Sequence, residues 1–153
     1  MGTMTCTVVV RDMHGSGSGA GTRTVDGLAR RAEDVLELQR AARTGGTAQL
    51  LRWLAVRSGA AVVLVDRSGL VVSPPSSRLG DTERDLILCG VRQTAIRSSR
   101  SVAIDRGDLA CVVLPLGGPA DVGTPLLAAV VPRPISPDLP LLLADAKIGR
   151  AHV

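Results

Sequence analysis

Apolar residues in the first third of the chain recur at the spacing of an α-helix. Between residues 25 and 43 they come every three to four positions with charged side chains between them: Val25, Leu28, Ala32, Val35, Leu36 and Leu38. Thr24 is a suitable N-cap, and Gly45-Gly46 ends the pattern. The spacing predicts a helix over residues 25–43, with Arg31 and Asp34 among its solvent-facing residues. This helix is short for a coiled coil, but its stripe could pair with a second copy.

A second helical pattern follows directly. Thr47 is a suitable N-cap, and Gly59 is a natural C-terminal stop. The residues between them predict a helix over residues 48–57 whose buried face holds Leu50, Leu51, Leu54 and Ala55.

After Gly59 the helical spacing of apolar residues ends, and patterns typical of β-strands begin. Residues 60–65 form a continuous apolar run with β-branched members, which is typical of a central strand. Further strands are predicted over residues 70–72, 101–104, 109–116 and 126–131, separated by turns rich in Asp, Gly and Pro. Residues 5–10 could also pair weakly as a strand.

Two more helices are predicted around these strands. Asp81 begins one over residues 82–98, with a broad face of small and apolar residues that includes Gly90 and Ile96. Ser136-Pro137 combines an N-cap with proline at the first helical position and opens another helix over residues 138–146.

This order of elements predicts an α+β fold. A five-stranded antiparallel sheet with helices packed on one face, preceded by a helix, fits it, as in GAF, PAS or profilin-like (roadblock) domains. The expected organisation is a flexible Gly/Ser-rich leader over 1–23, an N-terminal helix over 24–46, a GAF-like sensory domain over 47–134, the start of a linker helix over 135–146 and a tail over 147–153.

The last six residues, Ile-Gly-Arg-Ala-His-Val, resemble the in-frame translation of a sequencing adapter. The single lysine of the chain, Lys147, stands directly before them, and the helix over 138–146 has no stop signal of its own. We therefore expect residues 147–153 to be an artefact and the chain to be the N-terminal part of a longer protein.

Composition and charge narrow the function classes. The formal net charge of +4 falls to about +2 without the expected tail, and the arginines alternate with acids, so no nucleic-acid surface is indicated. No apolar run is long enough for a membrane span, and no signal peptide opens the chain. The three cysteines form no metal or disulfide pattern. A cytoplasmic protein is expected.

Catalytic chemistry is not indicated. The two histidines, His14 and His152, lie in the leader and the tail, so the expected domain lacks the commonest general base. Residues 15–19 contain Gly-x-Ser-x-Gly, but without the strand, helix and later histidine that a nucleophile elbow needs. We expect no catalytic residue, no metal site and no cofactor.

Five other residues have structural interpretations. Asp66 and Asp105 begin turns, where Asp normally bonds to its own backbone. Cys89 and Cys111 are interpreted as small buried hydrophobes. Trp53 is the only aromatic residue and is expected to pack in the core or an interface, with contact to a ligand as the alternative. No ligand-binding residue can be named.

Four segments together resemble the N-terminal region of PucR/CdaR-type bacterial transcriptional regulators. They are residues 25–43, 50–60 (Leu-Leu-Arg-Trp-Leu-Ala-Val-Arg-Ser-Gly-Ala), 63–69 and 141–146 (Leu-Leu-Leu-Ala-Asp-Ala). The resemblance implies a GAF-like sensory domain followed, much later, by a helix-turn-helix DNA-binding domain that this chain lacks.

The sequence therefore predicts a non-catalytic sensory and dimerisation domain of a cytoplasmic transcriptional regulator. Its expected partners are a small-molecule effector and a second copy, with DNA contacted only through the missing domain and no membrane contact. Two alternatives stay open: a roadblock-like interaction protein that serves a small GTPase, and the sensory domain of a signalling kinase or phosphatase.

Overall fold

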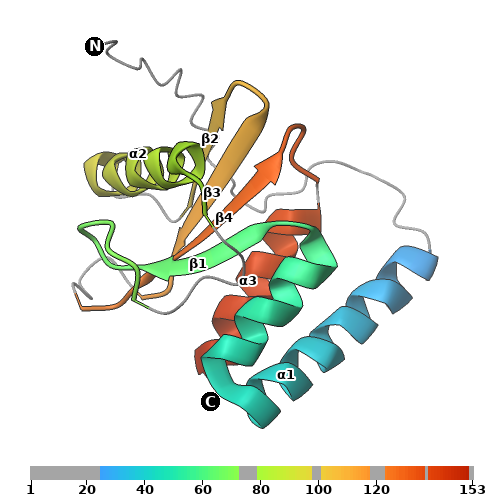
Figure 1. The fold of residues 1–153 in the computed structure, drawn as a ribbon. Helices are drawn as coiled ribbons and strands as arrows, with labels where there is room; N and C mark the ends of the chain where they lie inside the picture. Colours follow the sequence, from blue (N-terminus) through green and yellow to red (C-terminus); the bar gives the residue numbers. More distant parts are fainter. Residues whose placement is uncertain (1–24, 73–78, 98–100, 118–122, 137, 152–153) are drawn as a thin grey trace, which may run out of the picture.

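The computed structural model describes residues 25–72, 79–97, 101–117, 123–136 and 138–151 (Figure 1). In this part of the chain, three helices accompany a four-stranded antiparallel sheet. The elements are α1 (Val25–Ser58), β1 (Ala61–Val65), α2 (Asp81–Arg97), β2 (Val102–Arg106), β3 (Leu109–Pro115), β4 (Leu126–Pro132) and α3 (Asp138–Ala151). The leader over 1–23, with the weak strand over 5–10, lies outside the described residues.

The two helices predicted at the start of the chain form the two arms of α1. Gly46 interrupts the helix with φ 63° and ψ −150°, a conformation that residues with a Cβ rarely adopt. The N-terminal arm, residues 25–45, therefore turns back along the C-terminal arm, residues 47–58 (Figure 1). Leu38 and Leu54, one from each arm, are at most 1 % exposed and belong to the same core cluster.

The strands lie in the order β1-β4-β3-β2. β2 and β3 form a hairpin in which Ile104 lies opposite Cys111. β1 pairs with β4, with Val63 opposite Ala128, although α2 and two strands separate them in the sequence. β1 and β2 are thus the two edges of the sheet.

The predicted fifth strand, over residues 70–72, is not present. The chain does turn back along β1 there, but only Val71 forms a bridge, to Val65. The amide of Val72 donates to the carbonyl of Leu64 at 2.9 Å. Pro74 and Pro75 follow in the sequence, and proline cannot donate to a β-ladder.

Helices cover both faces of the sheet, so the prediction that they lie on one face is wrong. α1 and α3 pack on one face through Val62, Leu64 and Ala129, while α2 packs on the other through Val63, Val65 and Ala128 (Figure 1). The connection from β1 to β2 joins opposite edges of the sheet, and α2 crosses one face on the way. This explains why the strands are continuous apolar runs, because both faces are buried.

α2 lies close to β3 because Gly90 has no side chain. A Cβ at this position would lie 2.6 Å from Cγ2 of Val113, nearer than side chains approach one another. Ile96, which was predicted on the packed face of α2, is instead 73 % exposed. At the other end of the chain, α3 continues past Ala146 to Ala151, so part of the expected tail is helical.

Candidate functional site

Two adjoining hollows lie where the arms of α1 meet the beginning of α3. Their volumes are about 280 and 370 Å³, and both are lined by Arg57, Asp138 and Leu142. We call them together the Arg57 groove. Its remaining charged lining residues are Arg30, Arg31, Asp34 and Asp145, and its apolar ones include Leu28, Leu139 and Leu141.

Arg57 connects the two arms of α1. Its Nε and Nη2 atoms donate to the two carboxylate oxygens of Asp34 at 2.8 and 2.9 Å, which is a bidentate pair. The hydrogen bond that Arg57 donates to Asp34, together with the charge of Asp34, raises the pKa of Arg57 above its usual value, while partial burial acts in the opposite direction. Since the Asp34 side chain is only 13 % exposed, this pair is better shielded from water than a surface ion pair.

Two further polar contacts surround the pair. The Trp53 indole N–H donates to the Glu37 carboxylate at 3.2 Å, which joins the arms a second time. Arg31 approaches Asp145 of α3 to 3.6 Å. Trp53 also packs against the core cluster shared by α1, α3 and the sheet, as the packing interpretation requires. The groove therefore lies between helices that precede and follow the sheet. The Arg31–Asp145 contact connects α1 to α3, and the other two contacts connect the arms of α1.

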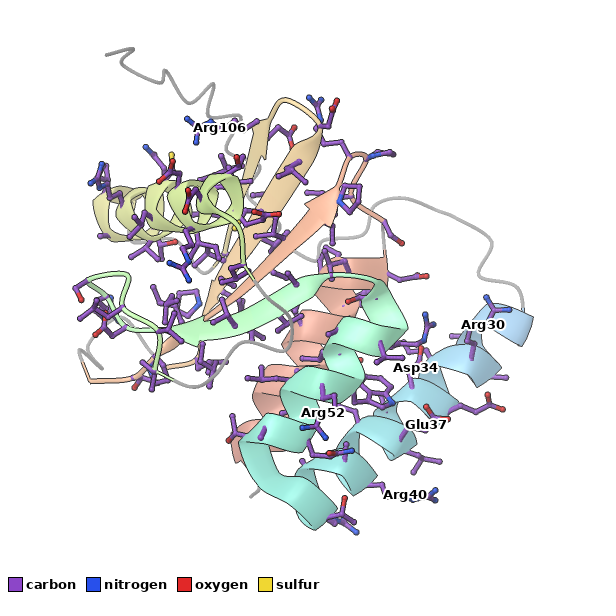
Figure 2. All side chains as sticks on the ribbon, in the orientation of Figure 1. Arg30, Asp34, Glu37, Arg40, Arg52 and Arg106 are labelled. Atoms are coloured by element: carbon purple, nitrogen blue, oxygen red, sulfur yellow. The ribbon has the colours of Figure 1, made fainter. Side chains whose placement is uncertain are left out.

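Sequence reasoning missed this site because it placed Asp34 and Arg31 on the solvent-facing side of their helix. Asp34 is buried, since the C-terminal arm folds back over that side. A usable signal existed: in an antiparallel hairpin, residues equally far before and after the turn lie opposite one another. Asp34–Arg57 and Glu37–Trp53 are both roughly symmetric about Gly46. Figure 2 shows Asp34 and Glu37 on the N-terminal arm, facing the C-terminal arm.

Asp66 has the turn-forming role that the sequence predicted. Its Oδ1 accepts hydrogen bonds from the amides of Ser68 and Leu70, at 2.9 and 3.0 Å, and from the Ser68 hydroxyl. The hydroxyl bond, followed by the backbone bonds, lowers the pKa of Asp66 below its usual value. The carboxylate is thereby committed to the turn after β1.

Asp105 lies on β2, at the opposite edge of the sheet from Asp66. Its carboxylate is 3.8 Å from the guanidinium of Arg133, which also donates to the carbonyl of Gly107 at 3.1 Å. The structure therefore does not bring the two turn acids together, and they cannot act as a catalytic pair.

The described cysteines lie between α2 and β3. Cys111 is fully buried, and burial, with a smaller effect from Cys89, raises the pKa of its thiol to about 12. Cys89 is half-buried and packs against the same core cluster. Because the thiolate is the reactive form, Cys111 is a poor nucleophile at neutral pH and behaves as a small core residue.

The remaining residues that the sequence analysis considered for catalysis or metal binding are not among the described residues. Cys6, His14, His152 and the Gly-x-Ser-x-Gly segment over 15–19 lie outside the described residues. Within the described ranges, no group of three or more His, Cys, Asp and Glu side chains is placed to hold a metal ion. None of the helices there has the length and apolarity needed to cross a membrane.

Comparison of the sequence with protein-family models finds no match, and comparison with curated proteins finds no significant match.

Proposed function

We propose that this chain is the non-catalytic sensory and dimerisation domain of a PucR/CdaR-type transcriptional regulator, whose helix-turn-helix domain lies beyond the sequence in hand. The observation that carries the proposal is the Arg57 groove. It lies between α1 and α3, the helices on either side of the sheet in the sequence, so an effector there would act on the helix that leads onward.

The mechanism is a shift in how α3 packs against α1. Arg57 comes from the last turn of α1 and Asp138 from the first turn of α3, and both line both hollows. A small polar effector that contacts both residues would stabilise one relative position of the helices. Binding can shift that equilibrium only if the effector binds one position more tightly than the other.

The chemistry of the described residues supports a role without catalysis. The buried thiol of Cys111 is held protonated, Asp66 bonds to its own turn, and Asp105 lies on β2 beside Arg133. The charged residues of the groove are largely engaged with one another, as in Asp34–Arg57 and Arg31–Asp145. Such a groove is suited to binding a ligand rather than to transferring a proton.

The first test is to sequence the genomic locus beyond the codon for residue 146 and translate it. A helix-turn-helix domain encoded downstream in the same frame is the expected result. A stop codon directly after the α3 codons would overturn the regulator proposal.

The second test concerns the effector site. The complete chain would be screened against small carboxylates, amino acids and nucleobase derivatives for an increase in melting temperature. Asp138→Asn should abolish the increase, because Asp138 lines both hollows. Asp85→Asn, a change of the same kind at an exposed position of α2, should preserve it. Equal increases in both variants would place the effector elsewhere.

One observation favours the roadblock-like interaction protein as a second candidate. Leu70, Val71 and Val72 beside the β1 edge are 50–68 % exposed, and exposed apolar segments of this kind often mark protein contacts. A partner could extend the sheet there. The locus test separates the two candidates, since a stand-alone interaction protein would end soon after α3.

A further inference from the structure

The hollow of the Arg57 groove that lies between the N-terminal arm of α1 and α3 has a balanced set of charges. Its volume is about 280 Å³, just below the ~300–1,000 Å³ of sites for drug-sized ligands. Its charged lining residues are three arginines and three aspartates: Arg30, Arg31, Arg57, Asp34, Asp138 and Asp145. The lining therefore has no excess of either sign, which favours a small ligand that is neutral overall.

Two of these six charges are available to a ligand. The other four form two ion pairs, Asp34–Arg57 and Arg31–Asp145. Arg30 and Asp138 are exposed, and neither side chain forms an ion pair or hydrogen bond with another described residue. Arg30 comes from the N-terminal arm (Figure 2) and Asp138 from the first turn of α3. The hollow thus offers one cation and one anion, each from a different helix.

The Asp138 carboxylate lies near the Asp34–Arg57 pair without joining it. After the hydrogen bond to Asp34 and the charge of Asp34, the charge of Asp138 also raises the pKa of Arg57. A carboxylate in the first turn of a helix interacts favourably with the helix dipole as well. Binding, rather than stability alone, is therefore the measurement that reveals what Asp138 does for a ligand.

Leucine side chains line the same hollow. Leu28 of the N-terminal arm is 51 % exposed, although it belongs to the lining, and Leu141 and Leu142 come from α3. A hydrocarbon group placed against Leu28 would remove apolar surface from water, which is favourable. The hollow therefore combines one available charge of each sign with an apolar wall.

We propose that this hollow binds an α-amino acid with an aliphatic side chain. Arg30 binds its carboxylate, Asp138 binds its ammonium group, and its side chain covers Leu28. The guanidinium of arginine presents parallel N–H donors that match a carboxylate. The inference rests on the proposed sensory function and names the chemical class of its effector. Because the two charged groups of the ligand contact different helices, binding holds the N-terminal arm against α3.

The same charges disfavour other classes of effector. A dicarboxylate or a phosphate ester would find only Arg30 available and would be repelled by Asp138. A simple amine would find only Asp138 and would be repelled by Arg30. Specificity of this kind comes from the unfavourable contacts of the wrong ligand as much as from the favourable contacts of the right one.

The test is isothermal titration calorimetry of the complete chain with leucine and two analogues that each lack one charge. Leucinamide has no carboxylate, and 4-methylpentanoate has no ammonium group. Each analogue should bind at least about tenfold more weakly than leucine, because each loses one charge-assisted hydrogen bond. This comparison uses the wild type only, so it does not depend on the folding of a variant.

Two variants assign the charges to residues. Arg30→Gln should weaken the binding of leucine about tenfold and leave that of leucinamide unchanged. Asp138→Asn should weaken the binding of leucine and leave that of 4-methylpentanoate unchanged. The matched control is Arg40→Gln, since Arg40 is exposed on the same arm and lies outside the lining of the groove (Figure 2). It should bind leucine as the wild type does.

The outcomes are distinguishable. A wild type that binds none of leucine, valine and methionine would overturn the inference, and so would one that binds 4-methylpentanoate as tightly as leucine. Unchanged leucine binding in both Arg30→Gln and Asp138→Asn would place the amino acid elsewhere and overturn the site. Each of these results leaves the regulator proposal to the locus test, which decides it independently.

Discussion

At the scale of single residues, Arg57 links segments that are distant in the sequence. It binds Asp34 of the opposite arm through Nε and Nη2, on one edge of its guanidinium, and lines the groove beside α3. Removing one member of such a pair leaves the other partly buried without its partner, which costs more than losing an exposed ion pair.

Arg57→Ala should lower the free energy of unfolding by about 1–2 kcal/mol, after allowance for partial exposure of the pair. Urea denaturation of the complete chain measures this. The matched control is Arg52→Ala, because Arg52 is exposed on the same arm and its contact with Gln49 is long, at 3.4 Å. Equal destabilisation by both variants would show that the Asp34 contact contributes nothing measurable.

Asp66 gives a prediction about pH. Its pKa in the folded chain is below the ordinary 3.8, so the unfolded chain binds the proton more readily. The stabilisation is fully present above about pH 4 and is lost as the pH falls through the lower folded value. The melting temperature of the wild type should therefore exceed that of Asp66→Asn at pH 6, and the gap should narrow below pH 4. A gap independent of pH would contradict this.

These two residues also show what a sequence can predict. The contacts of Asp66 lie within four residues of it, and turn chemistry was therefore sufficient to assign its role. The partner of Asp34 is 23 residues away, and finding it requires knowing that the chain folds back at Gly46. Local bonds can be predicted from residue type, whereas the groove depends on tertiary packing.

At the scale of elements, the α1 hairpin depends on one backbone conformation. Gly46 has φ 63°, and apart from its neighbours along the helix no heavy atom lies within 4 Å of where a Cβ would stand. A side chain would therefore fit in space, and the cost of replacing Gly46 comes from the backbone alone.

Gly46→Ala should accordingly destabilise the chain by about 1 kcal/mol through strain at positive φ. Gly123→Ala is the control, because Gly123 has open space around it and no positive φ. That change should leave stability nearly unaltered. Thermal denaturation of both variants makes the comparison, and an unchanged melting temperature for Gly46→Ala would mean that the hairpin turn adapts without cost.

Apart from the end of α3, the helices and longer strands were predicted nearly at their observed ends, since their apolar spacing and caps are local signals. The strand predicted over residues 70–72 was wrong, because three apolar residues after a turn suggest a strand whether or not a β-ladder forms. What decides the matter is whether the backbone continues to pair, and here it forms a single bridge, Val65–Val71.

At the scale of the whole molecule, one core cluster joins α1, α3 and one face of the sheet, and a second joins α2 to the other face. The continuous apolar runs of the strands already indicated burial on both faces. The order of elements alone did not indicate helices on both faces, because it does not say which face of the sheet each connection crosses. The GAF-like, PAS-like or profilin-like assignment remains a prediction.

Because α1 shares its core with the sheet and α3, the described domain should unfold as one unit. Trp53 is the only aromatic residue, so its fluorescence reports on the α1 hairpin, while far-UV circular dichroism reports on all elements. The two signals should share one midpoint in urea. An earlier fluorescence transition would mean that the arms of α1 separate before the rest unfolds.

The pairing of β1 with β4 has a consequence for synthesis on the ribosome. β1 emerges early, but its ladder partner follows only after α2, β2 and β3 have been made. Until β4 is made, the backbone of the apolar strand β1 can pair only through the Val65–Val71 bridge. The β2–β3 hairpin needs no such wait, since its strands are neighbours in the chain. The sheet should therefore grow from β2 toward β1, and the nascent chain is most open to aggregation or chaperone binding before β4 leaves the exit tunnel.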